Sequence, residues 1–534
     1  MAGARRACLR IRGDFRLHFF SPDLGCREIF DTKARLGQTM GTTMDRRSFL
    51  GGLAAGAFFS SLPGRIANAA TADNLAELDM IATAALIERK EVKASEVALA
   101  AMRRIDTLNP RLNALVTKSY KQAMRRAVLG QTGPLAGVPY ALKDLNWQEG
   151  VRFTQGSHFF ADGEGGPVTP YTQKIFDSGV LIMGQTNTPE FGFLPTTESA
   201  LLGPAHNPWN PDYSTAGSSG GAGAAVASRM LPAAQASDGG GSIRLPAAVN
   251  GVFGLKPSRG RFPNQGGDMS GWDLAVRHAV SMTVRDNAFL LALTEADEGA
   301  LEPVGFVDAP ARRRLKFAVS LRSGDVVADA EVQRAVRRVA KRLDDAGHRV
   351  EEVRKSPMDS PEFFDNFIVI WASNATGIVQ LVEQQTGQRA EDTGLLEPWT
   401  IGLARYFGSL DSDRLEVAQA HFRRLTNETA RFLRRWDGWI SPVTGHVTPK
   451  LGYFDPFVPY DTLLERATPF AAFTPIHNVA GTPALSVPAG FDARGLPIGV
   501  QIGAALGEER RLLEVAYELE ELMPWRDKKP PIAV

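Results

Sequence analysis

The spacing of apolar residues along the chain alternates between a helical period and short strand-like runs. Apolar residues recur every three to four positions over residues 73–106, with an expected stop at Asn109–Pro110, and again over 121–129, 329–347, 411–435 and 507–522. Short apolar runs that predict strands occupy residues 112–116, 138–142, 180–183, 313–320 and 439–442. Residues 188–192 resemble the start of a further helix. Because helices and strands alternate, we expect an α/β fold with a central mixed, twisted β-sheet covered by helices on both faces.

The same pattern predicts how the chain is divided. It contains no fixed-period repeat and no low-complexity linker, so we expect residues 70–534 to form a single domain. Within this domain, residues 312–435 are expected to be mostly helical. Such a segment is compatible with a lid or with a subdomain, and the sequence leaves both interpretations open.

Composition removes several classes of protein. The 534 residues include 60 Lys+Arg and 59 Asp+Glu, a net charge of +1, so no broad basic surface for nucleic acid is expected. Hydrophobic residues make up 44% and charged residues 22%, as in ordinary globular proteins. Both cysteines, Cys8 and Cys26, precede residue 70. The predicted domain therefore has no disulfide, no thiol nucleophile and no thiolate metal site.

The first 69 residues differ from the rest, with 11 Lys/Arg against 5 Asp/Glu. Residues 44–69 combine the pair Arg46-Arg47, an apolar stretch over 51–62 and the small-residue site Ala67-Asn68-Ala69. A dozen apolar residues are too few to cross about 30 Å of hydrocarbon, so this segment predicts a cleaved twin-arginine-type signal peptide rather than an anchor. The alternative is a chance arginine pair before a buried helix.

The signal peptide carries predictions about location and about the true start of the chain. We expect the mature protein in the periplasm or outside the cell, without stable insertion in a membrane. Residues 1–43 would place the signal far from the N-terminus. They are therefore expected to be untranslated or disordered, with translation starting at Met40 or Met44.

Two serines in glycine-rich loops are the strongest chemical feature. Nine of the 38 residues from 217 to 254 are glycine, and these loops contain Ser218 and Ser242. The run Gly239-Gly240-Gly241 before Ser242 exposes successive N–H groups, as an oxyanion hole requires. A serine nucleophile needs a base, and Lys143 at the end of an apolar strand is the better candidate, because burial favours its neutral amine. Seven histidines after residue 69 keep a Ser-His-Asp arrangement open.

Other cofactor and metal sites are not indicated. The pair Gly221-x-Gly223 lacks the preceding strand and the third glycine of a dinucleotide-binding loop. No glycine loop is followed by Lys and Ser or Thr, and the histidines lack the spacing of metal ligands. We therefore expect neither a cofactor nor a metal.

These residues resemble the amidase signature family of Ser–Ser–Lys hydrolases. The matching stretches are GVPYALKDL at residues 137–145, residues 217–229, DGGGSIRLPAAVNGVFGLK at residues 238–256, and residues 473–501. The resemblance implies the amidase-signature fold and hydrolysis of a carboxylic amide C–N bond. It also implies a nucleophilic Ser242, a general base Lys143, and a bridging Ser218 held by a cis peptide, with the N–H groups of Gly239, Gly240 and Gly241 forming the oxyanion hole.

The residues around the predicted site are expected to support it. The family commonly has Gly-Thr before Asp238, where this chain has Ala236-Ser237. Asp238 and Arg244 are interpreted as a structural ion pair that braces the loop. Ser219 and Ser237 are interpreted as hydrogen-bonding loop residues rather than as catalysts.

Within the family, the chain is similar to the 6-aminohexanoate cyclic-dimer hydrolases. The shared segments are residues 133–145, residues 186–190 and the ending Met523-Pro524-Trp525. This similarity suggests small-molecule substrates: linear or cyclic amides of ω-amino acids, or other hydrophobic amides. Phe193 and Trp371 stand where that group has polar or small residues, so we expect them to narrow the substrate pocket. The alternative is that Trp371, Phe367 and Ile370 belong to the core, because aromatic and apolar residues on a helix are more often core than pocket.

Three other functions stay open on the sequence. A cytoplasmic subunit that amidates mischarged transfer RNA belongs to the same family, but the export signal disfavours it. A periplasmic amide-binding protein without catalysis would not need Lys143, Ser218 and Ser242 together. A Ser-His-Asp esterase would not need Lys143. Whether the protein forms a homodimer is also left open.

Overall fold

A large mixed β-sheet runs through the part of the chain that the structure, a computed structural model, describes: residues 75–263, 274–310 and 312–534. The strands follow the spatial order β14 (Arg349–Glu352), β11 (Lys316–Val319), β15 (Gly438–Pro442), β17 (Pro497–Gly503), β16 (Ala484–Phe491), β9 (Phe253–Lys256), β10 (Val276–Ser281) and β8 (Ala233–Asp238). Neighbours are parallel from β14 to β15 and antiparallel from β15 to β8. The predicted mixed sheet and α/β class are confirmed.

Smaller sheets surround the large one. The three-stranded sheet has the order β1 (Leu115–Lys118), β3 (Leu181–Thr186) and β2 (Pro139–Lys143), and the two-stranded sheets pair β4 (Glu198–Ser199) with β5 (Gly203–Pro204), β6 (His206–Asn207) with β7 (Asn210–Ser214), and β12 (Arg322–Ser323) with β13 (Val326–Val327). Strand β2 lies beside β8 of the large sheet, because the backbone N–H of Lys143 donates to the side chain of Gln235 at 2.9 Å. This contact brings Lys143 toward the glycine loop that follows β8.

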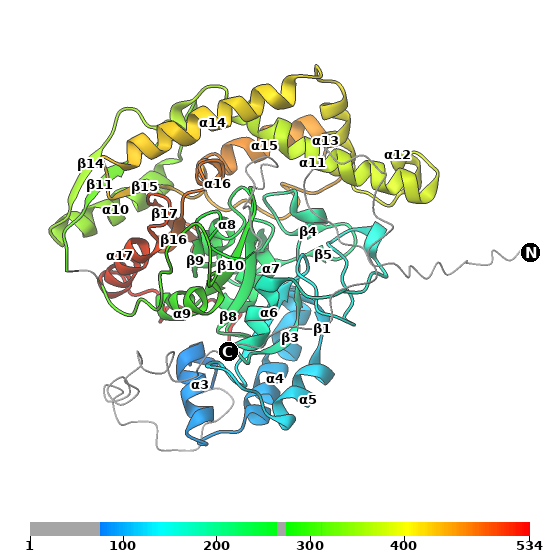
Figure 1. Cartoon of the computed structure of the whole chain (residues 1–534), viewed down its shortest axis with the longest axis vertical. Coiled ribbons are helices and arrows are strands. Elements are labelled where there is room, and N and C mark those ends of the chain that lie inside the picture. Colours follow the sequence, from blue (N-terminus) through cyan, green and yellow to red (C-terminus); the bar gives the residue numbers. More distant parts are fainter. Residues whose placement is uncertain (1–74, 264–273, 311) are drawn as a thin grey trace, which may run out of the picture. The chain divides into compact units, whose positions relative to one another are not determined.

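Helices cover the large sheet on both sides, and α7, α8, α9, α10 and α17 contact its strands directly. The helices of the described residues are α3 (Met80–Glu88), α4 (Ala94–Leu112), α5 (Tyr120–Leu129), α6 (Pro170–Asp177), α7 (Gly220–Ala227), α8 (Arg244–Asn250), α9 (Val284–Thr294), α10 (Ala330–Asp345), α11 (Phe363–Thr386), α12 (Ala390–Thr393), α13 (Pro398–Gly408), α14 (Arg414–Leu433), α15 (Tyr460–Phe470), α16 (Pro475–Val479) and α17 (Glu509–Leu522), with 3-10 turns η1 (His158–Phe160), η2 (Glu190–Gly192) and η3 (Pro357–Asp359). In Figure 1, α14 and α16 lie on one side of the strands, and α9 and α17 lie on the other.

The central strands are buried on both faces, which explains their sequence. Every residue of β15 and of β17 is buried. In β17, Ile498, Val500 and Ile502 enter the main core and alternate with Gly499, Gln501 and Gly503 on the other face. That face is buried against α8, where a Cβ atom at Gly499 would lie only 2.5 Å from Ala248, so the close packing requires glycine there.

The segment from β11 to α14 supplies a helical layer beside the glycine loops. Between the strands β11 and β15 it contains α10, α11, α13 and α14, and α11 contacts both α13 and α14. Aromatic residues of α11 and α14 pack together, with the rings of Phe363 and Phe422 5.8 Å apart. This layer therefore forms part of the fold's aromatic core.

Two local predictions are wrong. The expected stop at Asn109–Pro110 does not occur, because α4 continues to Leu112 and ends at Asn113, which has a left-handed φ of 45°. Residues 188–192 do not begin a long helix. They form only the turn η2, because Phe191 and Gly192 adopt positive φ values of 51° and 72°.

The predictions for residues 1–69, including the signal peptide over 44–69, lie outside the described residues. All described residues belong to one compact unit. No helix within the described ranges is long and apolar enough to cross a membrane.

Candidate active site

A fully buried lysine lies at the centre of the predicted site. Lys143 ends strand β2, its side chain is 0% exposed, and its Nζ donates to Ser218 Oγ at 2.6 Å and to Ser237 Oγ at 3.0 Å. Burial lowers the pKa of Lys143 well below 10.5, and the charge of Asp238 raises it by a smaller amount. Both of its hydrogen-bond partners are neutral hydroxyls. The site therefore favours the uncharged amine over the ammonium form.

The two predicted catalytic serines lie next to each other. The backbone N–H of Ser218 donates to Ser242 Oγ at 2.9 Å. Lys143 contacts the hydroxyl of Ser218 and Ser242 contacts its amide, so the three residues lie together although they stand far apart in the sequence. Ser218 is 3% exposed and Ser242 is 9% exposed. The Ser218 amide positions Ser242 Oγ beside Ser218 but does not itself pass a proton; a relay to a serine nucleophile runs through the Ser218 hydroxyl, which Lys143 already contacts.

The loop that carries Ser218 differs from the prediction in one respect. No cis peptide bond is present in the described ranges, so the expected cis peptide at Ser218 is wrong for this structure. Instead, Ala216 and Gly217 adopt left-handed φ values of 50° and 54° and turn the chain at this point. The Ser218 hydroxyl therefore reaches Lys143 across a trans peptide.

The three glycines before Ser242 do not all face the same way. The N–H of Gly241 donates to the Asp238 carboxylate at 2.7 Å, so the prediction that it belongs to the oxyanion hole is corrected. Gly239 and Gly240 are half-buried beside the candidate pocket, and their amides remain the candidate oxyanion donors. A Cβ atom at Gly240 would lie 3.0 Å from the ring of Phe367, and one at Gly239 would lie 3.1 Å from the ring of Trp371.

Asp238 and Arg244 form the structural ion pair that the sequence predicts. Both side chains are 0% exposed, and the guanidinium donates through Nε and Nη2 to the two carboxylate oxygens at 2.9 and 2.8 Å. The remaining N–H groups donate to Thr474, Gln501 and Asn478 at 2.5–2.8 Å. All five donors of Arg244 are therefore used, as burial of a charged group demands.

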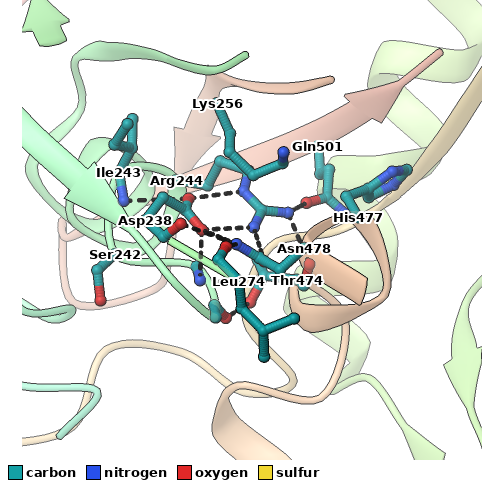
Figure 2. Close-up of polar contacts among 12 residues, drawn as sticks. Asp238, Ser242, Ile243, Arg244, Lys256, Leu274, Thr474, His477, Asn478 and Gln501 are labelled. Carbon is teal, nitrogen blue, oxygen red and sulfur yellow. Dashed lines mark hydrogen bonds and ion pairs between the residues drawn. The ribbon is translucent and has the colours of Figure 1, made fainter. Parts of the chain in front are cut away.

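Arg244 and its partners Asp238, Thr474, Asn478 and Gln501 form a cluster that we call the Arg244 hub. Figure 2 shows this hub between the glycine loop and the C-terminal strands, with the Ser242 hydroxyl pointing away from it. Burial raises the pKa of Asp238, but the charge and hydrogen bonds of Arg244, with smaller contributions from Lys256 and Asn478, outweigh burial and leave the pKa below 3.8. Asp238 is therefore a charged anchor. It holds the amides of Gly241 and Ile243 and so fixes the loop on which Ser242 stands.

Ser219 and Ser237 support the site in different ways. Ser219 Oγ donates to the carbonyl of Ser237 and accepts from its amide, both at 3.2 Å, so it braces strand β8 as predicted for a structural residue. Ser237 is also a direct partner of Lys143, which the sequence analysis missed. Alternate residues of a strand point to the same face, so Gln235 and Ser237 of β8 lie on one face, and both bind Lys143. This alternation could have indicated Ser237 from the sequence.

An aromatic pocket opens beside Ser242. About 660 Å³ of empty space, open solvent included, lies within it, and none of the described residues that line it is charged. The predicted pocket residues Phe193 and Trp371 both line it, with ring centres 5.9 Å apart. Phe367 stacks on Trp371 at 5.4 Å and also lines the pocket, whereas Ile370 is buried in the core.

The sequence analysis did not find the far wall of the pocket. Trp399 of α13 and Leu464 of α15 line it, although they follow Ser242 by more than 150 residues. Only tertiary packing brings these helices to the glycine loops, so the apolar pattern could not assign them to the pocket rather than to the core.

A histidine-dependent site is not supported. The hydrogen bonds of Ser218 and Ser242 found within the described ranges involve no histidine. His477, which stands beside the Arg244 hub in Figure 2, bonds to Thr482 at 2.9 Å. Among the residues that the structure describes, no cluster of His, Cys, Asp or Glu could hold a metal ion.

Comparison with known proteins agrees with this geometry. A family-wide sequence profile described as Amidase matches residues 96–513. The AmiC protein of Mycobacterium tuberculosis is 37% identical over 471 residues, covering 86% of this chain and 98% of AmiC. A 6-aminohexanoate-cyclic-dimer hydrolase of a Pseudomonas species is 30% identical, covering 85% of this chain and 96% of the hydrolase.

A solved structure of 6-aminohexanoate cyclic dimer hydrolase complexed with substrate superposes with a TM-score of 0.79 at 29% identity, covering 86% of this chain and 100% of that protein. Together with the match to the family profile, this shows that the chain belongs to the amidase family and is an amide-hydrolysing enzyme.

The lowered pKa of Lys143 predicts how stability changes with pH. Unfolding returns the side chain to water, where its pKa is 10.5, so the unfolded chain binds the extra proton at pH values between the lowered pKa and 10.5. We expect the free energy of unfolding of the wild-type protein to rise, relative to that of Lys143→Met, as pH increases through this window. Chemical denaturation at a series of pH values measures it. A difference that does not change with pH would contradict the lowered pKa.

Proposed function

We propose that the protein hydrolyses amides through an acyl-enzyme on Ser242, with Lys143 and Ser218 as its proton relay. The observation that carries this proposal is that Lys143 Nζ donates to Ser218 Oγ at 2.6 Å, while the Ser218 amide donates to Ser242 Oγ at 2.9 Å and so holds the nucleophile beside the Ser218 hydroxyl. Because burial lowers the pKa of Lys143, the neutral amine needed as a base is available without a histidine.

The geometry supports the following sequence of steps. Neutral Lys143 accepts a proton through the Ser218 hydroxyl as Ser242 Oγ attacks the amide carbonyl carbon. The oxyanion is stabilised by the amides of Gly239 and Gly240, and the proton returns through Ser218 to the nitrogen of the leaving amine. Water then attacks the ester on Ser242, and the same relay removes its proton. The carboxylic acid leaves and the free serine is restored.

Variants of Lys143 and Ser242 test this mechanism against two alternatives: a non-catalytic amide-binding protein and an esterase that uses another base. We expect Lys143→Met and Ser242→Ala each to lower kcat/KM for an anilide by about 10³-fold or more, because proton transfer and the nucleophile are both lost. Release of aniline provides the measurement, and circular dichroism checks folding.

Labelling with a fluorophosphonate separates the remaining outcomes. Wild-type protein is expected to be labelled on Ser242. An unlabelled protein would favour a non-catalytic amide-binding protein, and activity that survives in Lys143→Met would favour an esterase that uses another base.

The pocket supports a substrate with an uncharged, apolar acyl group. The described wall residues include Phe193, Phe367, Trp371, Trp399 and Leu464, and they offer no charged partner to a substrate. Relatives named 6-aminohexanoate-cyclic-dimer hydrolase and acylamidase occur among the similar proteins. We therefore propose hydrophobic amides, linear or cyclic, as substrates; an amide of an ω-amino acid would fit when its amino group is not charged.

A charged substrate tests the apolar wall. We expect kcat/KM for hexananilide to exceed that for 6-aminohexananilide by about 10²-fold or more at neutral pH, because the ammonium group would be buried without a partner. The two compounds differ only at the end of the acyl chain, so aniline release isolates this effect. Equal values would show that the acyl chain does not enter the pocket.

We also propose that residues 44–69 export the protein to the periplasm or beyond. Arg46-Arg47, the apolar stretch and the small-residue site before Ala70 support this proposal, as does a start of translation at Met40 or Met44. Fractionation of a bacterial host is expected to find a periplasmic form that begins at Ala70, and this form should be absent when Arg46 and Arg47 are replaced by lysine. Periplasmic protein in the lysine variant, or a precursor that begins at Met1, would contradict it.

A further inference from the structure

A buried carboxylate connects the pocket to the rest of the fold without touching the catalytic residues. Glu190 begins the turn η2 and is 2% exposed. Its Oε1 accepts a hydrogen bond from Ser157 Oγ at 2.7 Å. Its Oε2 accepts from the backbone N–H of Glu397 at 2.9 Å and from Thr400 Oγ1 at 2.5 Å. No cation pairs with it among the described residues, so three neutral donors hold the group.

Two of these donors belong to the start of helix α13. Glu397 is the residue before the helix and Thr400 is in its first turn. The free N–H groups at a helix start donate favourably to a carboxylate, because the helix dipole has its positive end there. Glu190 therefore caps α13 from another element, and the cap fixes the distance between α13 and the turn η2.

The turn and the helix carry facing parts of the pocket. Trp399 directly precedes Thr400 in helix α13, and its Nε1 donates to the carbonyl of Phe193 at 3.3 Å. Nε1 of Trp371 on α11 donates to the same carbonyl at 3.0 Å. One carbonyl beside η2 thus holds two indole rings of the pocket wall.

The turn η2 also lies beside Ser218 of the proposed proton relay. A Cβ atom at Gly192, in the turn η2, would lie 3.2 Å from Ser218 Oγ. Gly192 also lines the pocket together with Ser242. Gly192 thus lies against Ser218, while the carbonyl of the next residue, Phe193, binds both indoles, so the turn links the catalytic serines to the indole wall.

We propose that Glu190 is a positioning residue that sets which acyl groups the enzyme accepts. By capping α13 it keeps Trp399, and through the Phe193 carbonyl also Trp371, at a fixed distance from Ser242. Acyl groups long enough to reach the indoles then gain contact and orientation, whereas an acetyl group gains neither. This role rests on the proposed function, because it requires the acyl chain to occupy this pocket.

Selectivity between a long and a short acyl group tests the role. In Glu190→Gln the amide nitrogen cannot accept, so one of the bonds to Ser157 or α13 is lost. We expect the ratio of kcat/KM for decananilide to that for acetanilide to fall by about tenfold or more, through a higher KM and lower kcat for decananilide. The value for acetanilide should change by less than about threefold.

Matched variants separate position from stability. Thr400→Val removes one bond to Glu190 and should reduce the ratio of kcat/KM for decananilide to that for acetanilide. Thr400→Ser keeps the hydroxyl and should keep this ratio at the wild-type value. Asp286→Asn is the control, because Asp286 is a buried carboxylate that accepts from the first two amides of α3 in the same manner. It should lower the melting temperature and leave the ratio unchanged.

The outcomes are distinct. An unchanged ratio in Glu190→Gln and Thr400→Val, or equal loss of activity on both anilides, would overturn the positioning role while wild-type labelling of Ser242 keeps the proposed function. Failure to label Ser242 in the wild-type protein would overturn the proposed function, and the positioning role with it.

Discussion

A lysine amine buried among hydroxyls, without a carboxylate against it, is the constraint on which the rest of the site depends. In water the amine would be charged, and inside the protein that charge has no ion-pair partner among the described residues. Burial therefore favours the neutral form of Lys143, which can accept a proton. The same burial costs stability, so the fold must hold the lysine in place with interactions made elsewhere.

The Asp238–Arg244 pair holds the loop that carries Ser242. It stands at the junction of β8, α8 and the C-terminal strands, and every N–H of the guanidinium is used. Asp238 also holds the amides around Ser242. The site therefore has two kinds of buried basic side chain: Arg244 is charged and fully paired, whereas Lys143 has only hydroxyl partners and is favoured in its neutral form, as the proposed base requires.

Much of the site could be predicted from the sequence, because its parts depend on local patterns. An apolar strand ends at Lys143, and glycine loops present Ser218 and Ser242. The direction of the Gly241 amide could not be predicted, because it depends on where the Asp238 carboxylate lies. The helical period of α11 could not decide whether Trp371 faces the core or a pocket. Only packing against η2 and α13, far along the chain, settles that it lines the pocket.

The most direct test of the relay is a crystal structure of the protein after reaction with a fluorophosphonate. The account predicts phosphorus bonded to Ser242 Oγ, the phosphonyl oxygen within hydrogen-bond distance of the Gly239 and Gly240 amides, and Lys143 Nζ bonded to Ser218 Oγ. Phosphorus on another residue, or Lys143 turned away from Ser218 toward a carboxylate, would contradict it.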